Sequence, residues 1–129
     1  MARIKDIVID CALPAPLARF WAAALDGYSV GPYERTEIAR LSALGIDDID
    51  DDPTVVVEGP TGEPRFCFQR VPEGKGGKNR LHLDLVAGDP DVELARLVEL
   101  GATVVADRRT TDHWVTLTDP EGNEFCLLF

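Results

Sequence analysis

Residues 80–86 read Arg80-Leu81-His82-Leu83-Asp84-Leu85-Val86. Polar and apolar side chains alternate along this stretch, and a period of two is typical of a half-buried β-strand. We therefore expect the three leucines to be buried and the other side chains to lie on the opposite face. A histidine between charged neighbours in mid-strand indicates a site rather than an ordinary solvent-facing surface.

The composition narrows the classes of function. The chain has 129 residues, which suits one domain with its own core, and a net charge of -10. This acidity argues against nucleic-acid binding, because neutralising phosphates requires clustered Lys and Arg. No apolar run is long enough to span a bilayer and no export signal is visible, so we expect no membrane association and a cytoplasmic location.

The cysteines Cys11, Cys67 and Cys126 are odd in number and lack CxxC spacing. Each lies in an apolar, strand-like run. We therefore interpret them as small buried side chains rather than as a disulfide framework or a zinc site.

Periodicity and turn residues predict the remaining elements. Helices are expected from Pro14 to the residues before Gly27, at 34–44, and from Pro90 to the residues before Gly101. The acidic run 47–52 lacks the spacing of a calcium loop and is predicted to be a solvated loop. Besides 80–86, strands are expected at 4–11, 28–33, 54–58, 65–70, 103–106, 114–118 and 124–129.

The two halves of the chain resemble each other. Gly59-Pro60-Thr61-Gly62 ahead of Phe66-Cys67 matches Asp119-Pro120-Glu121-Gly122 ahead of Phe125-Cys126. This repeat predicts a single α+β domain of two tandem βαβββ modules, at about 1–71 and 80–129, joined by a linker at about 72–79. We expect the modules to form a curved mixed sheet around a concave cavity, with the helices on its outer face.

Strand parity predicts which side chains line this concave wall. The set is polar and includes one histidine. Enclosing such groups in a cavity costs free energy unless they pair, bind a metal or contact a ligand. The predicted wall consists of Asp6, Asp10, Arg65, Cys67, Gln69, Arg80, His82, Asp84, Glu124 and Cys126.

Three stretches carry a family resemblance: Leu17-Ala18-Arg19-Phe20-Trp21, Leu81-His82-Leu83-Asp84, and Asp119-Pro120-Glu121-Gly122-Asn123-Glu124-Phe125. With them, the chain resembles the vicinal oxygen chelate superfamily of glyoxalase-like and bleomycin-resistance-like proteins over essentially its whole length. It is most similar to the small glyoxalase-like domains of actinobacterial type.

The resemblance implies a divalent metal held by one residue from each of four strands, usually His or Glu. His82 and Glu124 match two of these positions. The other two positions carry Asp6 and Arg65, and an arginine cannot ligate a metal because it stays protonated.

Two functions are compatible with these residues. In the first, Asp6, His82 and Glu124 hold Mn, Fe, Ni, Zn or Mg, and Glu124 serves catalysis in a lyase, isomerase or dioxygenase that acts on a small oxygenated substrate. In the second, which we favour, Arg65 leaves the metal site degenerate and the protein binds a small molecule. No organic cofactor is implied.

For the binding function we expect the ligand-contacting side chains to be polar residues of the wall, with Trp114 stacking on a planar ligand. The expected set is Arg65, Gln69, Arg80, Asp84 and Trp114. A purely structural role for His82 is the remaining alternative. The resemblance, and the prevalence of twofold assemblies, also predict a homodimer.

Overall fold

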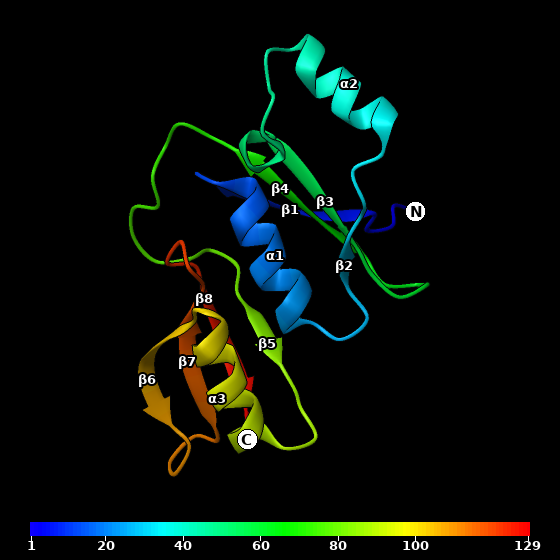
Figure 1. Ribbon diagram of the computed structural model, residues 1–129. Coiled ribbons are helices and arrows are strands. Elements are labelled where there is room, and N and C mark those ends of the chain that lie inside the picture. Colours follow the sequence, from blue (N-terminus) through cyan, green and yellow to red (C-terminus); the bar gives the residue numbers. More distant parts are fainter. The chain divides into compact units, whose positions relative to one another are not determined.

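The computed structural model describes every residue from Met1 to Phe129. It divides the chain into two compact units, unit 1 (Met1–Gly74) and unit 2 (Lys75–Phe129) (Figure 1). Each unit has its own four-stranded mixed sheet and follows the order strand, helix and three strands. The α+β class and the tandem βαβββ modules are thereby confirmed. The division falls inside the glycine-rich stretch 72–79.

Unit 1 forms a sheet of order β1-β4-β3-β2, in which β1 and β4 are parallel and the other pairs are antiparallel. A second helix and a 3₁₀ turn are inserted between β2 and β3. The elements are β1 (Asp6–Cys11), α1 (Pro14–Ala24), β2 (Ser29–Val30), α2 (Arg35–Ala43), the 3₁₀ turn (Ile49–Asp51), β3 (Thr54–Glu58) and β4 (Arg65–Arg70).

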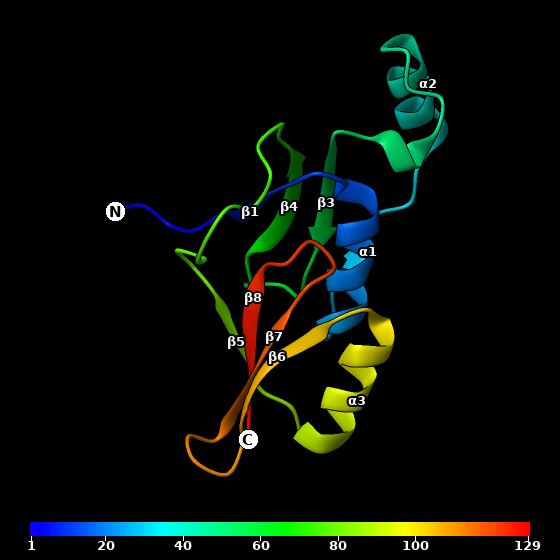
Figure 2. The same ribbon diagram turned by 90° about the vertical axis from the view of Figure 1, so that its left-hand side faces the viewer.

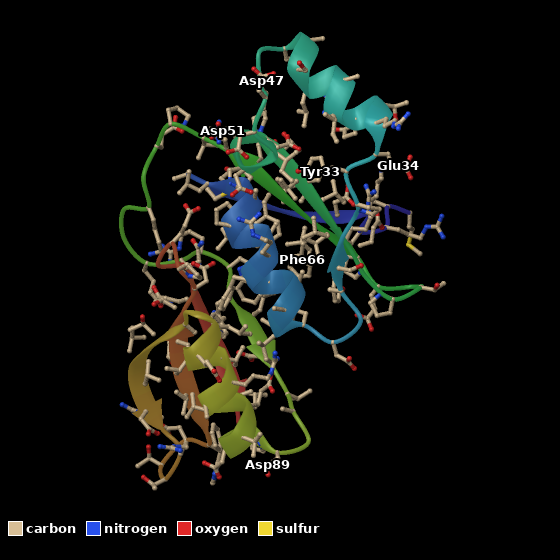
Figure 3. The ribbon with its side chains drawn as sticks, in the orientation of Figure 1. Tyr33, Glu34, Asp47, Asp51, Phe66 and Asp89 are labelled. Carbon is tan, nitrogen blue, oxygen red and sulfur yellow. The ribbon has the colours of Figure 1, made fainter.

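Helix α1 covers one face of the unit 1 sheet, and Phe66 of that sheet is labelled beside the helix in Figure 3. Pro14 opens the helix, where a missing N–H costs nothing. Trp21 is 2% exposed and stacks on Phe66 with ring centroids 6.5 Å apart, so it belongs to the core. Asp6, Arg65 and Gln69 lie on the other face of the sheet.

Unit 2 forms the sheet β5-β8-β7-β6, again with one parallel pair, β5 and β8. Helix α3 lies along one face of this sheet (Figure 2). Asp89, labelled in Figure 3, caps the helix by accepting a hydrogen bond from the Val92 N–H, and Gly101 ends it with a positive φ. The elements are β5 (Leu83–Leu85), α3 (Pro90–Leu100), β6 (Thr103–Arg108), β7 (Trp114–Thr118) and β8 (Glu124–Leu128).

Strict alternation along β7 and β8 separates two faces of the unit 2 sheet. Val115, Leu117, Phe125 and Leu127 are fully buried on the face that α3 covers. The alternate residues lie on the opposite face, which we call the open face of unit 2. Its members from these two strands are Trp114, Thr116, Thr118, Glu124, Cys126 and Leu128.

Three local predictions are wrong. The strand expected at 28–33 is limited to the two residues of β2. The strand expected at 80–86 is limited to β5, and Leu81, expected to be buried, is 66% exposed. β5 pairs only with β8, whose register ends opposite Leu83, so the residues before it have no strand partner. Asp52, at the end of the acidic run, is buried rather than solvated, because the Tyr33 hydroxyl and the Thr54 N–H donate to its carboxylate.

None of the three helices combines the length and the apolar character that a membrane span requires.

Candidate functional site

In unit 1, the parallel pairing of β1 with β4 places Asp6 directly opposite Arg65. The Arg65 guanidinium donates from Nε to Asp6 Oδ1 at 2.8 Å and from Nη2 to Oδ2 at 3.1 Å. Its Nη1 donates to Glu58 at 3.1 Å. The hydrogen bonds from Arg65 lower the pKa of the Asp6 carboxyl, and its partners raise the pKa of Arg65. Both groups therefore stay charged and paired.

The other predicted wall residues of β4 are less engaged. Gln69 is exposed at the far end of the strand, beside Asp10 in the register. Cys67 lies between Val8 and Val56 on the neighbouring strands. Burial raises the pKa of its thiol, and the nearby Asp6 carboxylate adds to the rise. These surroundings make Cys67 a poor nucleophile.

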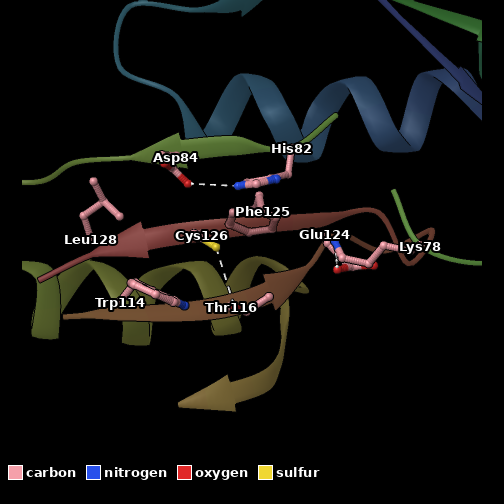
Figure 4. A pocket seen from close by; sticks show the side chains of 9 residues that line it. All are labelled: Lys78, His82, Asp84, Trp114, Thr116, Glu124, Phe125, Cys126 and Leu128. Atoms are coloured by element: carbon pink, nitrogen blue, oxygen red, sulfur yellow. Dashed lines mark hydrogen bonds and ion pairs between the residues drawn. The ribbon is translucent and has the colours of Figure 1, made fainter. Parts of the chain in front are cut away.

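In unit 2, the open face of the sheet forms a pocket of about 410 Å³ (Figure 4). The strand registers arrange its side chains in rows across the sheet. Asp84, Cys126 and Thr116 are neighbours in one row, and Leu128 and Trp114 form the next. Lys78 and Glu124 lie at the opposite end of the pocket from Trp114 (Figure 4). The pocket therefore has an apolar end and a charged end.

Glu124 is held by the residues that precede β5. The Lys78 ammonium lies 2.6 Å from Glu124 Oε2, and the Lys75 ammonium lies 4.0 Å from Oε1. Asn79 accepts a hydrogen bond from the Glu124 backbone N–H. The hydrogen bond from Lys78 is the main cause of a lowered pKa of the Glu124 carboxyl, which makes this group a weak proton acceptor.

Along the adjacent edge of the pocket, His82, Asp84 and Cys126 converge. The distance from His82 Nε2 to Asp84 Oδ1 is 3.4 Å, and one ligand-type atom from each of the three residues lies within 4.8 Å of the others. The Thr116 hydroxyl is 3.5 Å from the Cys126 sulfur. The imidazole and the carboxylate are about half exposed, so both are accessible from solvent.

Of the predicted site residues, His82, Asp84, Trp114 and Glu124 line this pocket, whereas Arg80 is exposed and does not. Asp6 and Arg65 meet each other in unit 1. Sequence reasoning did not identify the two lysines or Thr116 as site residues. A basic linker just before a site strand was the available signal for Lys75 and Lys78, and the strand parity of Trp114 was the signal for Thr116.

The metal implied by the family resemblance can be tested against these contacts. The Arg65 guanidinium has no lone pair with which to bind a metal, and it donates hydrogen bonds to both carboxylate oxygens of Asp6. The Glu124 carboxylate is paired with the Lys78 ammonium. Among the four family positions, only His82 offers a metal-ligating atom that is not paired with a cationic side chain. The chemistry of these positions does not fit a divalent metal, so we derive no step through one there.

Solved structures of other proteins share this fold. The chain superposes on a glyoxalase/bleomycin resistance protein/dioxygenase family enzyme from Burkholderia phytofirmans PsJN with a TM-score of 0.65 and 18% identity, covering 98% of this chain and 97% of that one. For a possible glyoxalase from Bacillus cereus, the TM-score is 0.65 at 13% identity, with 100% of both chains covered.

The trypanothione-dependent glyoxalase I of Leishmania major gives a TM-score of 0.60 at 13% identity, over 99% of this chain and 86% of that one. No curated protein matches the sequence. Residues 6–128 match the family of glyoxalase-like domains, which is nearly the whole chain. The chain therefore belongs to the glyoxalase-like domain family, and with it to the vicinal oxygen chelate superfamily.

Proposed function

We propose that this protein binds a small molecule in the pocket on the open face of unit 2, and that its metal site at the family positions is degenerate. The observation that carries the proposal is the composition of that pocket, which has an aromatic end and a charged end within about 410 Å³. Ligand pockets typically combine this size with an apolar lining and a few placed polar groups.

The pocket chemistry indicates the class of ligand. Trp114 is 37% exposed and, with Leu128 beside it, offers an apolar surface for a planar group. Thr116, His82 and Asp84 offer hydrogen-bond donors and acceptors along the middle. We therefore assign a small, planar molecule whose polar atoms lie to one side of its ring.

The charged contacts favour binding over a metal-dependent lyase, isomerase or dioxygenase reaction. Such a reaction at the family positions needs a Lewis acid and a free carboxylate near the substrate. Glu124 is neutralised by Lys78, and Asp6 by Arg65. The same contacts move the ligand-binding role away from Arg65, because its guanidinium already serves two carboxylates.

The test is a screen of small planar acids, phenols and heteroaromatic compounds by thermal shift, followed by titration with tryptophan fluorescence. We expect a compound that raises the melting temperature and changes the Trp114 emission. Trp114→Ala should weaken its binding by about tenfold or more, the range for losing an aromatic contact and its buried area.

Arg80→Ala is the control, because Arg80 precedes β5, one of the strands that line the pocket, but lies outside the pocket itself. It should leave the dissociation constant unchanged. Equal weakening by Arg80→Ala and Trp114→Ala, or a screen in which no compound stabilises the protein, would contradict the proposal.

A further inference from the structure

We propose that His82, Asp84 and Cys126 form a binding site for a thiolate-preferring divalent metal ion of the Zn²⁺ class on the open face of unit 2. An imidazole nitrogen, a carboxylate oxygen and a thiol sulfur from these residues lie within 4.8 Å of one another. This site shares only His82 with the four family positions. It goes beyond the proposed function, because the metal can bind without any organic ligand.

The sheet register produces this convergence. Asp84 and Cys126 are direct partners across the parallel pair β5 and β8, so their side chains leave the same face of the sheet. His82 precedes Asp84 by two residues and points to that face as well (Figure 4). Because β5, the residue directly before it and β8 supply all three groups, the site is complete within unit 2.

The separations suit a tetrahedral ion. Zn²⁺ takes nitrogen and oxygen ligands at about 2.0–2.2 Å and sulfur at about 2.3 Å, which places the ligand atoms of a tetrahedron roughly 3.3–3.8 Å apart. The His82 Nε2 to Asp84 Oδ1 distance of 3.4 Å lies in this range. Three protein ligands leave a fourth position open, which is the arrangement of an accessible site.

The charges around the site are compatible with a dication. A carboxylate and a thiolate together supply two negative charges, and binding releases the thiol proton of Cys126 to solvent. The lysine that lines the pocket, Lys78, is paired with Glu124. The Thr116 hydroxyl contacts the Cys126 sulfur at 3.5 Å and orients it, as partners of metal ligands commonly do.

The repeat provides an internal comparison. In unit 1, Cys67 occupies the register position that Cys126 has in unit 2, but its neighbours are Val8 and Val56 instead of Asp84 and Thr116. The position equivalent to His82 is Asp6, which Arg65 holds. The same fold therefore presents one cysteine with metal-binding neighbours and one without.

The experiment uses the full chain, treated with chelator and desalted, and titrates it with Co²⁺ as a spectroscopic substitute for Zn²⁺. We expect a sulfur-to-cobalt charge-transfer band that saturates at one equivalent and disappears when Zn²⁺ is added. Cys126→Ser should abolish the band, and Asp84→Asn should weaken binding by about tenfold or more. Cys67→Ser, the matched control, should keep both the band and the affinity.

Three results would overturn the site: no band in the wild-type protein, a band that survives Cys126→Ser, or a larger loss from Glu124→Gln than from Asp84→Asn. The last result would return the metal to the family positions. If Cys126→Ser does not fold, alkylation of the wild-type protein decides the question. Zn²⁺ should protect Cys126 but not Cys67, as followed by mass spectrometry, and equal labelling of Cys126 with and without Zn²⁺ would contradict the site.

Discussion

Arg65 and Asp6 face each other across the parallel strands β1 and β4 and share two hydrogen bonds, at 2.8 and 3.1 Å. In unit 2 the equivalent register positions are those of Glu124 and His82, which sit directly before the paired residues Phe125 and Leu83. The two units thus place an ion pair and a potential metal ligand at corresponding points of the same βαβββ frame. The two positions of unit 1 at which the family resemblance implies metal ligands hold an internal salt bridge.

The Asp6–Arg65 pair should make stability depend on pH in a defined window. Because Arg65 holds the folded-state pKa of Asp6 below its ordinary value of 3.8, the pair stabilises the fold fully above that pH and loses its contribution as pH falls through the lower, folded value. Asp6→Asn should therefore lower the melting temperature at pH 7, and the difference from wild type should shrink below about pH 4.

Melting temperatures measured at a series of pH values check this prediction. Asp10→Asn is the control, because Asp10 is an exposed carboxylate further along the same strand. Its effect at pH 7 should be smaller than that of Asp6→Asn. A difference between Asp6→Asn and wild type that grows on acidification would have the wrong sign for this ion pair.

The contact between Lys78 and Glu124 predicts a pKa change that can be measured at one carboxyl group. A nearby ammonium stabilises the ionised form, so Lys78→Gln should raise the pKa of Glu124 toward its ordinary value of 4.5. Lys75→Gln should cause a smaller rise, since its ammonium lies at 4.0 Å instead of 2.6 Å. Carbon-detected NMR titration of the Glu124 carboxyl reports both values. Equal effects of the two variants would show that Lys78 has no special position.

Strict alternation of apolar and polar side chains, in segments bounded by turn residues, made much of the fold predictable. The strands at 54–58, 65–70 and 114–118 have the expected bounds, because each has a buried face and pairs along most of its length. The length of the strand at 80–86 was overestimated, because this stretch pairs with a neighbouring strand over only part of its length. Its only partner is β8, and alternation alone does not tell how far a partner strand extends.

The site was predictable only as far as strand parity reaches. Parity indicated that His82, Asp84 and Glu124 share one polar face, and it allowed Trp114 to border it. The register between β5 and β8, which aligns Asp84 with Cys126, depends on the pairing of strands far apart in the sequence. The contact of Lys78 with Glu124 likewise depends on where a flexible side chain finds an opposite charge.

The separation of the two faces of β7 predicts unequal losses of stability for substitutions at neighbouring residues. Leu117 is fully buried, so Leu117→Ala should lower the free energy of unfolding by about 2–5 kcal/mol through lost burial and the cavity left behind. Thr118 lies on the open face, and Thr118→Ala should cost less than about 1 kcal/mol. Urea denaturation measures both. Similar losses from the two variants would mean that the open face is packed as tightly as the core.

The two tryptophans should respond differently to solvent and to ligand. Trp114 is 37% exposed in the pocket, whereas Trp21 is 2% exposed on the buried side of α1. Iodide should therefore quench the emission of Trp114 and leave that of Trp21 nearly unchanged. The single-tryptophan variants Trp21→Phe and Trp114→Phe separate the two signals, and circular dichroism verifies that each variant is folded.

A ligand that stacks on Trp114 should shield it from iodide in Trp21→Phe and have no effect on quenching in Trp114→Phe. Because iodide reaches only exposed indole rings, shielding of Trp114 would locate the ligand at the apolar end of the pocket, and unchanged quenching of Trp114 with the ligand bound would place it elsewhere.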